Sequence, residues 1–147
     1  MKSKSKSLKL SIAFTTFFAI LLAFLTLTAP WSVKIICEYF HRARLTNFLI
    51  VVTYLAVPAG WGAILLLYKI LFNVNKKIIF VKENVKYLQI LSWLCFYVGV
   101  LSAISTVKFI AFAIVSLSAL FIGLIVRVVR NIIHKAIQIK EENELTI

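Results

Sequence analysis

The sequence predicts an all-α integral membrane protein, a single membrane domain over residues 1–147 folded as an antiparallel four-helix bundle. Hydrophobic residues make up 62% of the 147 residues, whereas soluble domains contain roughly 45–50% even when glycine is counted. Charged residues make up 15%, against about 25% in a soluble domain. The chain also contains four uncharged runs of 18 to 24 residues, each close to the ~20 residues that cross a bilayer as a helix. A soluble enzyme and a disordered tail are both excluded.

The first two uncharged runs predict the first two spans. Residues 10–33 carry no charge and predict a span near residues 10–30. This run is longer than the roughly 7–15 apolar residues of a signal peptide, and no A-x-A-like cleavage site follows it, so we interpret it as an uncleaved anchor. Residues 45–68 form the second run and predict a span near residues 46–70.

The third and fourth runs, residues 87–107 and 109–126, are separated only by Lys108. One unbroken helix through both would be about 60 Å long, twice the thickness of the hydrocarbon core. We therefore expect a hairpin at residues 105–108, which divides this segment into spans near residues 86–106 and 108–127.

The basic residues predict that both termini face the cytoplasm. With this orientation the cytoplasmic side carries 13 Lys and Arg residues, and the outer side carries four, Lys34, Arg42, Arg44 and Lys108. Such a bias follows the positive-inside rule. The net charge of +12 is then mostly a feature of the inner leaflet, where anionic lipid attracts Lys and Arg at about 1 kcal/mol each. Nucleic acid is therefore not expected as a direct partner.

Two connecting segments contain apolar residues. Residues 31–46 predict a short helix in the outer interface, because their apolar residues recur at helical spacing and Lys34 and Glu38 form an i,i+4 pair. This helix would be a structural lid or a ligand sensor. On the inner side, Ile78–Val81 are four consecutive apolar residues that need burial, and Asn84 is the expected N-cap of the third helix.

The fourth helix is predicted to continue into the cytoplasm as a tail, residues 128–147. One face is basic and the other is an apolar stripe, formed by Val128, Val129, Ile132, Ile133, Ala136 and Ile137. The stripe is too apolar to face water alone. Three covers stay open: the inner-side connection that contains Ile78–Val81, a second subunit or soluble protein, or the anionic inner leaflet with head groups at Arg127, Arg130 and Lys135. The acidic end of the tail, Glu141, Glu142 and Glu144, suits a basic protein partner.

No set of residues predicts catalysis, a cofactor or a metal site. The interiors of the spans contain no Asp, Glu, Lys, Arg or His, which disfavours an ion-coupled transporter. Small residues in the fourth span, including Ser116 and Gly123, predict close helix packing with hydroxyl hydrogen bonds. Cys37 and Cys95 are expected at depths about 15 Å apart, which is too far for a disulfide. We expect a protein that is not an enzyme.

Two short segments resemble a known family. Residues 78–88, Ile-Ile-Phe-Val-Lys-Glu-Asn-Val-Lys-Tyr-Leu, resemble the second-to-third helix connection of the YoaS-like family, small bacterial four-helix membrane proteins classed as a domain of unknown function. Residues 141–147, Glu-Glu-Asn-Glu-Leu-Thr-Ile, resemble the acidic ending of that family. The family often has Gly and Pro in the inner turn, where this chain has Lys77 and Ile79. The residues that match are Phe80, Asn84, Leu88, Asn143, Leu145 and Thr146.

The resemblance implies a place in the bacterial cytoplasmic membrane and a neighbouring gene for a helix-turn-helix regulator. The function expected first is therefore a regulatory or interaction protein whose cytoplasmic face binds such a soluble partner. The alternative is an immunity protein or a small exporter component that acts on membrane-active peptides, and a homo-oligomer is left open in either case. The candidate partner-binding residues are Phe80, Asn84, Leu88, Arg127, Arg130, Lys135, Glu142, Asn143, Leu145 and Thr146.

Overall fold

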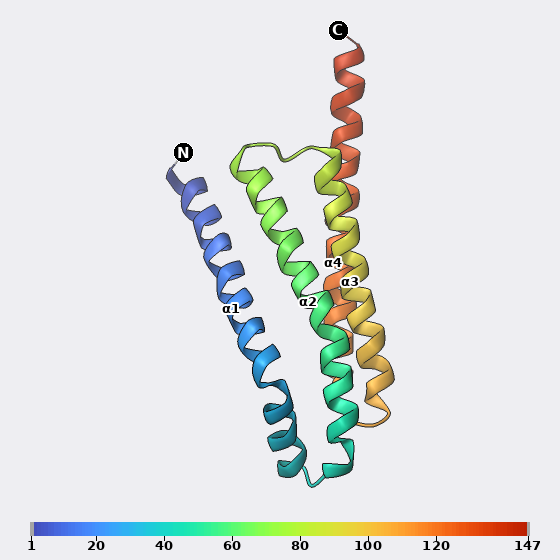
Figure 1. The fold of residues 1–147 in the computed structure, drawn as a ribbon. Helices are drawn as coiled ribbons and strands as arrows, with labels where there is room; N and C mark the ends of the chain where they lie inside the picture. Colours follow the sequence, from blue (N-terminus) through green and yellow to red (C-terminus); the bar gives the residue numbers. More distant parts are fainter. Residues whose placement is uncertain (1, 147) are drawn as a thin grey trace.

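The computed structural model describes the backbone of residues 2–146 and the side chains of residues 6–146; Met1 and Ile147, the two ends of the predicted domain, lie outside the described residues. Four long helices run antiparallel (Figure 1), and the all-α four-helix bundle is confirmed. They are α1 (Lys2–Tyr39), α2 (Thr46–Asn75), α3 (Lys82–Thr106) and α4 (Phe112–Leu145). Each is long and apolar enough to cross a membrane, so the chain is a multi-pass membrane protein.

Both ends of the chain lie at the same end of the bundle as the connection between α2 and α3 (Figure 1). We call this connection, residues 76–81, the inner loop. The opposite end holds the 3₁₀ helix η1 (Ala43–Leu45) and the turn at residues 107–111. There the Arg42 guanidinium donates a hydrogen bond to the Lys108 carbonyl at 3.1 Å, and the rings of Phe40 and Phe109 meet edge to face at 5.4 Å between centroids.

The bundle is open, because each helix packs only on its neighbours in the sequence. Among the described residues α1 contacts α2, α2 contacts α3 and α3 contacts α4, with no contact between α1 and α3 or α4, or between α2 and α4. The α3–α4 contact is the most extensive. The Ser92 hydroxyl donates to the Gly123 carbonyl at 2.9 Å, and the Ser116 hydroxyl donates to the Gly99 carbonyl at 2.8 Å. These bonds confirm the close packing predicted from small residues in the fourth span.

The predicted outer interfacial helix over residues 31–46 is wrong. Residues 31–39 instead continue α1, which passes through Pro30 without a break. A proline inside a helix leaves the carbonyl four residues earlier without its usual donor, here the carbonyl of Thr26. The hydroxyl of Tyr54 on α2 points to this oxygen at 3.5 Å. A neighbouring helix thus supplies the missing donor, as is common where helices cross membranes.

The other helix boundaries shift by a few residues from those predicted. The second helix ends at Asn75 rather than near residue 70. The turn between α3 and α4 lies at residues 107–111 rather than 105–108, because the carbonyl of the buried Ser105 accepts the backbone N–H groups of Lys108 and Phe109 and closes the end of α3. The third helix begins at Lys82, with Val81 at the N-cap position. The prediction of Asn84 as the N-cap is therefore wrong.

Candidate functional site: the inner-loop end of the bundle

The backbone of the inner loop begins with a helix-ending turn. The N–H of Ile78 donates to the Asn73 carbonyl at 2.9 Å, and the N–H of Lys77 donates to the Val74 carbonyl at 3.0 Å. This pair of bonds is the Schellman motif, in which the residue just after the helix adopts a left-handed conformation and is usually glycine. Lys77 occupies that position with a φ of 61°. This turn is therefore a Schellman motif with a lysine at the position where glycine is usual.

Asn84 holds the loop against the bundle. Its side-chain oxygen accepts a hydrogen bond from the Asn73 amide at 2.7 Å, and its own amide donates to the carbonyls of Ile78 at 3.2 Å and Ile79 at 2.9 Å. Only 2% of Asn84 is exposed. One buried amide in the first turn of α3 thus joins α2, the loop and α3, which is a different task from capping its own helix.

After the residues held by Asn84, the inner loop lies beside the C-terminal part of α4, which extends past the loop. Phe80 and one face of α4 line a hollow of about 410 Å³. The residues of α4 that line it follow the spacing of one helix face: Ala136, Ile139, Lys140, Asn143 and Glu144. Phe80 and Ile139 are each about half exposed, at 51% and 49%. The hollow therefore has apolar walls, and Lys140, Asn143 and Glu144 supply its polar groups.

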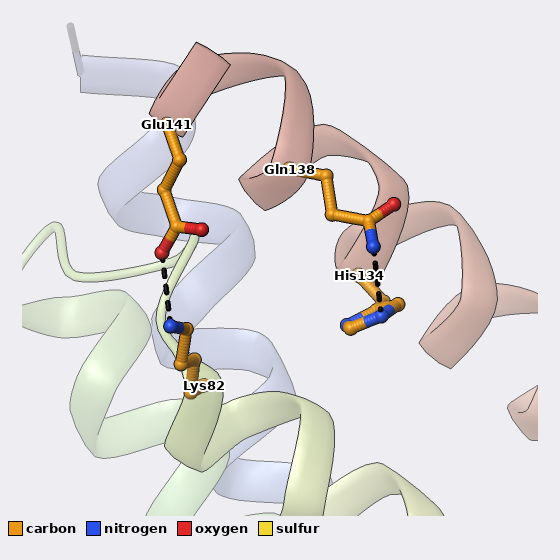
Figure 2. Close-up of polar contacts among 4 residues, drawn as sticks. All are labelled: Lys82, His134, Gln138 and Glu141. Carbon is orange, nitrogen blue, oxygen red and sulfur yellow. Dashed lines mark hydrogen bonds and ion pairs between the residues drawn. The ribbon is translucent and has the colours of Figure 1, made fainter. Parts of the chain in front are cut away.

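An ion pair also joins the start of α3 to α4, on another side of α4 from the hollow. The Lys82 ammonium lies 3.0 Å from the Glu141 carboxylate, and one turn away the side chains of His134 and Gln138 are 3.4 Å apart (Figure 2). Lys82–Glu141 is the one ion pair between side chains in the part of the chain that the structure describes. Both partners are largely exposed, so this pair positions α4 while contributing little stability.

The apolar stripe on α4 is covered only in part. Ile137 is buried, Ile133 and Ala136 are half-buried, and the first three residues of the stripe, Val128, Val129 and Ile132, stay exposed. Of the three predicted covers, the structure brings the inner loop to the far half of the stripe, since Phe80 and Ala136 line one hollow.

The structure separates the ten predicted site residues into four groups. Phe80 and Asn143 meet in the hollow, while Lys135, Glu142, Leu145 and Thr146 are exposed on α4 or just after it. Arg127 and Arg130 lie apart from the hollow, beside Trp93 on α3. Asn84 and Leu88 are only 2% and 9% exposed, so these two side chains lie inside the bundle and not on the surface that a soluble partner could reach.

Glu144 belongs to the acidic end that the sequence already suggested for a basic partner, but sequence reasoning missed two other residues of the hollow, Ile139 and Lys140. Their spacing from Ala136 was visible in the sequence, but the position of the loop beside them was not. No group of three or more His, Cys, Asp or Glu side chains among the described residues could hold a metal ion. Cys37 and Cys95 are both free thiols, as their predicted separation requires.

Comparison with known proteins identifies a family over nearly the whole chain. The family model described as "Protein of unknown function (DUF2975)" matches residues 7–147, which confirms the resemblance to a family classed as a domain of unknown function. No curated protein matches the chain, and no solved structure matches it. The match includes all four helices, the inner loop and the extension of α4. The chain therefore belongs to the family described as Protein of unknown function (DUF2975).

Proposed function

We propose that this protein is a non-enzymatic regulatory or interaction protein of the bacterial cytoplasmic membrane, and that its inner-loop end binds a soluble partner such as a helix-turn-helix regulator. The observation that carries the proposal is the hollow between Phe80 and α4, an open apolar recess on a helix that continues past the inner loop to Leu145. Apolar recesses with polar rims are typical of protein-binding surfaces.

The distribution of charge supports a cytoplasmic position for this surface. The inner-loop end carries most of the Lys and Arg residues, while the opposite end carries four. Loops rich in Lys and Arg stay in the cytoplasm, and this orientation places both termini there as well.

The chemistry of the recess favours a partner with an apolar side chain flanked by basic residues. The walls formed by Phe80 and Ile139 would receive the apolar group, and Glu144 at the rim with the nearby exposed Glu142 would attract the basic groups. Acidic groups near an interface raise the rate of association with a basic partner. DNA-binding domains are basic proteins, so a transcription regulator fits this surface.

The orientation can be tested with reporter fusions. A fusion after Lys140 should report a cytoplasmic position, and a fusion within residues 34–44 should report the outer side. Reporter activity that places residue 140 outside the cell would overturn the orientation, and with it a cytoplasmic partner.

Binding can be tested with the full-length protein in lipid nanodiscs and the purified regulator encoded by the neighbouring gene. Replacing Ile139 by glutamate places a charge in the apolar wall, and we expect at least tenfold weaker binding, about 1.4 kcal/mol. The matched control is Gln138→Glu, which adds the same charge one residue away, outside the hollow. Equal affinities of the two variants would contradict the assignment of the hollow.

A different outcome would favour the alternative function. If the neighbouring gene encodes a membrane-active peptide rather than a regulator, and the chain protects cells from that peptide, the protein is an immunity protein and the regulatory proposal fails.

A further inference from the structure

A second recess lies between α3 and α4, apart from the hollow. It is a notch of only about 20 Å³, lined by residues of two helices: Gln89, Ser92 and Trp93 on α3, and Arg127 and Arg130 on α4. Arg127 and Arg130 are three residues apart and so share a side of α4. The Arg127 guanidinium carbon lies 5.9 Å from the centre of the Trp93 ring, which is within the range of a cation–π contact.

Among the described residues, neither guanidinium group has a carboxylate partner. The one described ion pair between side chains joins Lys82 to Glu141, and the only described side-chain hydrogen bond of Arg130 runs from its Nη1 to the Asn131 side-chain oxygen at 2.9 Å. The Nε of Arg130 is buried and has no acceptor. A buried donor left without an acceptor is costly, and more so in a charged group. Two positively charged side chains thus line the notch, and one of them, Arg130, has a buried donor without an acceptor.

The position of the notch along the bundle matches the head-group region of a bilayer. The hydrogen bond between Ser92 and Gly123 fixes the register of the two helices, and Arg127 follows Gly123 by four residues, about 6 Å along the axis towards the inner loop. Arg127 is also the first charged residue after the uncharged run 109–126.

We infer that this notch binds the phosphodiester group of an anionic phospholipid in the leaflet on the inner-loop side, with Arg127 and Arg130 as its ligands. A recess of about 20 Å³ holds roughly one oxygen atom, because a single water already needs about 10–15 Å³. One phosphate oxygen enters the notch beside the Arg127 and Arg130 side chains, and the rest of the head group stays outside. Arginine matches the geometry of phosphate with two parallel hydrogen bonds, and basic recesses between helices on the cytoplasmic side bind anionic lipid head groups.

This site is independent of the proposed protein partner, because it needs neither the hollow nor the acidic residues of the tail. It would fix one lipid at the α3–α4 seam, just before α4 leaves the membrane. The base of the α4 extension would then be anchored on one side by lipid and on the other by the inner loop.

The test uses the full chain in a neutral detergent, with lipid binding counted by native mass spectrometry. The probes are phosphatidylglycerol, phosphatidylcholine and inorganic phosphate. We expect one phosphatidylglycerol to bind at least tenfold more tightly than phosphatidylcholine. The variant with Arg127→Gln and Arg130→Gln should lose about tenfold in affinity for phosphatidylglycerol. The control with Lys76→Gln and Lys77→Gln removes the same charge from the same end of the bundle and should stay within about twofold.

Three further variants separate the explanations. Arg127→Lys with Arg130→Lys keeps the charge but loses the paired hydrogen-bond geometry, so its affinity should fall between the wild type and the glutamine variant. The single variants Arg127→Gln and Arg130→Gln give the same direction if the double variant does not fold. If the double glutamine variant of the arginines and the Lys76→Gln, Lys77→Gln control lose the same affinity for phosphatidylglycerol, the effect is one of general charge and the site is overturned. Inorganic phosphate that displaces the lipid at equal concentration would show a free-phosphate site instead.

Discussion

Replacing Asn84 by alanine should release the inner loop while leaving the four spans in place. The substitution removes two donated hydrogen bonds and one accepted one, which reach Ile78, Ile79 and Asn73 at 2.7 to 3.2 Å. Each such bond contributes about 0.5–1.5 kcal/mol, and the partners left unpaired add to the cost. We expect the free energy of loop opening to fall by about 2–4 kcal/mol.

Limited digestion with trypsin measures that free energy directly. Lys76 and Lys77 are the cleavage sites within the loop. Cleavage of a briefly opened segment follows the population of the open form when opening and closing are fast. A change of about 2–4 kcal/mol therefore predicts roughly 30- to 900-fold faster cleavage after these lysines, read from the fragment masses of the protein in detergent.

Two companion variants make the result specific. Asn75→Ala makes the same chemical change at an exposed position at the end of α2, and its cleavage should stay within about twofold of the wild type. Asn84→Asp keeps the acceptor for Asn73 but turns an oxygen towards two carbonyl oxygens, so it should be at least as severe as alanine. An Asn84→Ala protein that is cleaved no faster than the Asn75→Ala control would refute the role of Asn84 as the anchor of the loop.

The four spans were predictable because a bilayer imposes a simple rule on the sequence. Each uncharged run must be about 20 residues long to cross as a helix, and all four runs in this chain became helices. The ends of the helices were less predictable, because they depend on contacts between distant residues. The sequence predicts that the first span ends near Pro30, but α1 continues to Tyr39, and Tyr54 on the next helix reaches the freed Thr26 carbonyl.

In the candidate site, too, the residues that local motifs indicate were predictable, whereas contacts between residues distant in the sequence were not. Phe80 and Asn143 were named from a resemblance in short motifs, and the structure brings them to one hollow. Asn84 was read as a helix cap because asparagine is a common cap, whereas its actual partners lie up to 11 residues away. The neighbourhood of Arg127 and Trp93 depends on the register of α3 against α4, which no local pattern specifies.

The remaining predictions concern how the helices are held together, and thermal unfolding in one detergent measures both. Lys82→Ala breaks the exposed pair with Glu141, so it should cost less than about 1 kcal/mol, and the difference should vanish at high salt. Gly99→Ala should cost about 1–3 kcal/mol by overpacking, because its new carbon would lie 2.6 Å from the Leu120 Cδ2 and 2.7 Å from the Cγ. Gly62→Ala is the matched control, since its carbon would meet only the end of a flexible leucine at 3.1 Å, which can move aside. Equal loss of stability in both glycine variants would contradict a close contact specific to the α3–α4 seam, because the seam then would tolerate a methyl group as easily as the looser contact between α2 and α3.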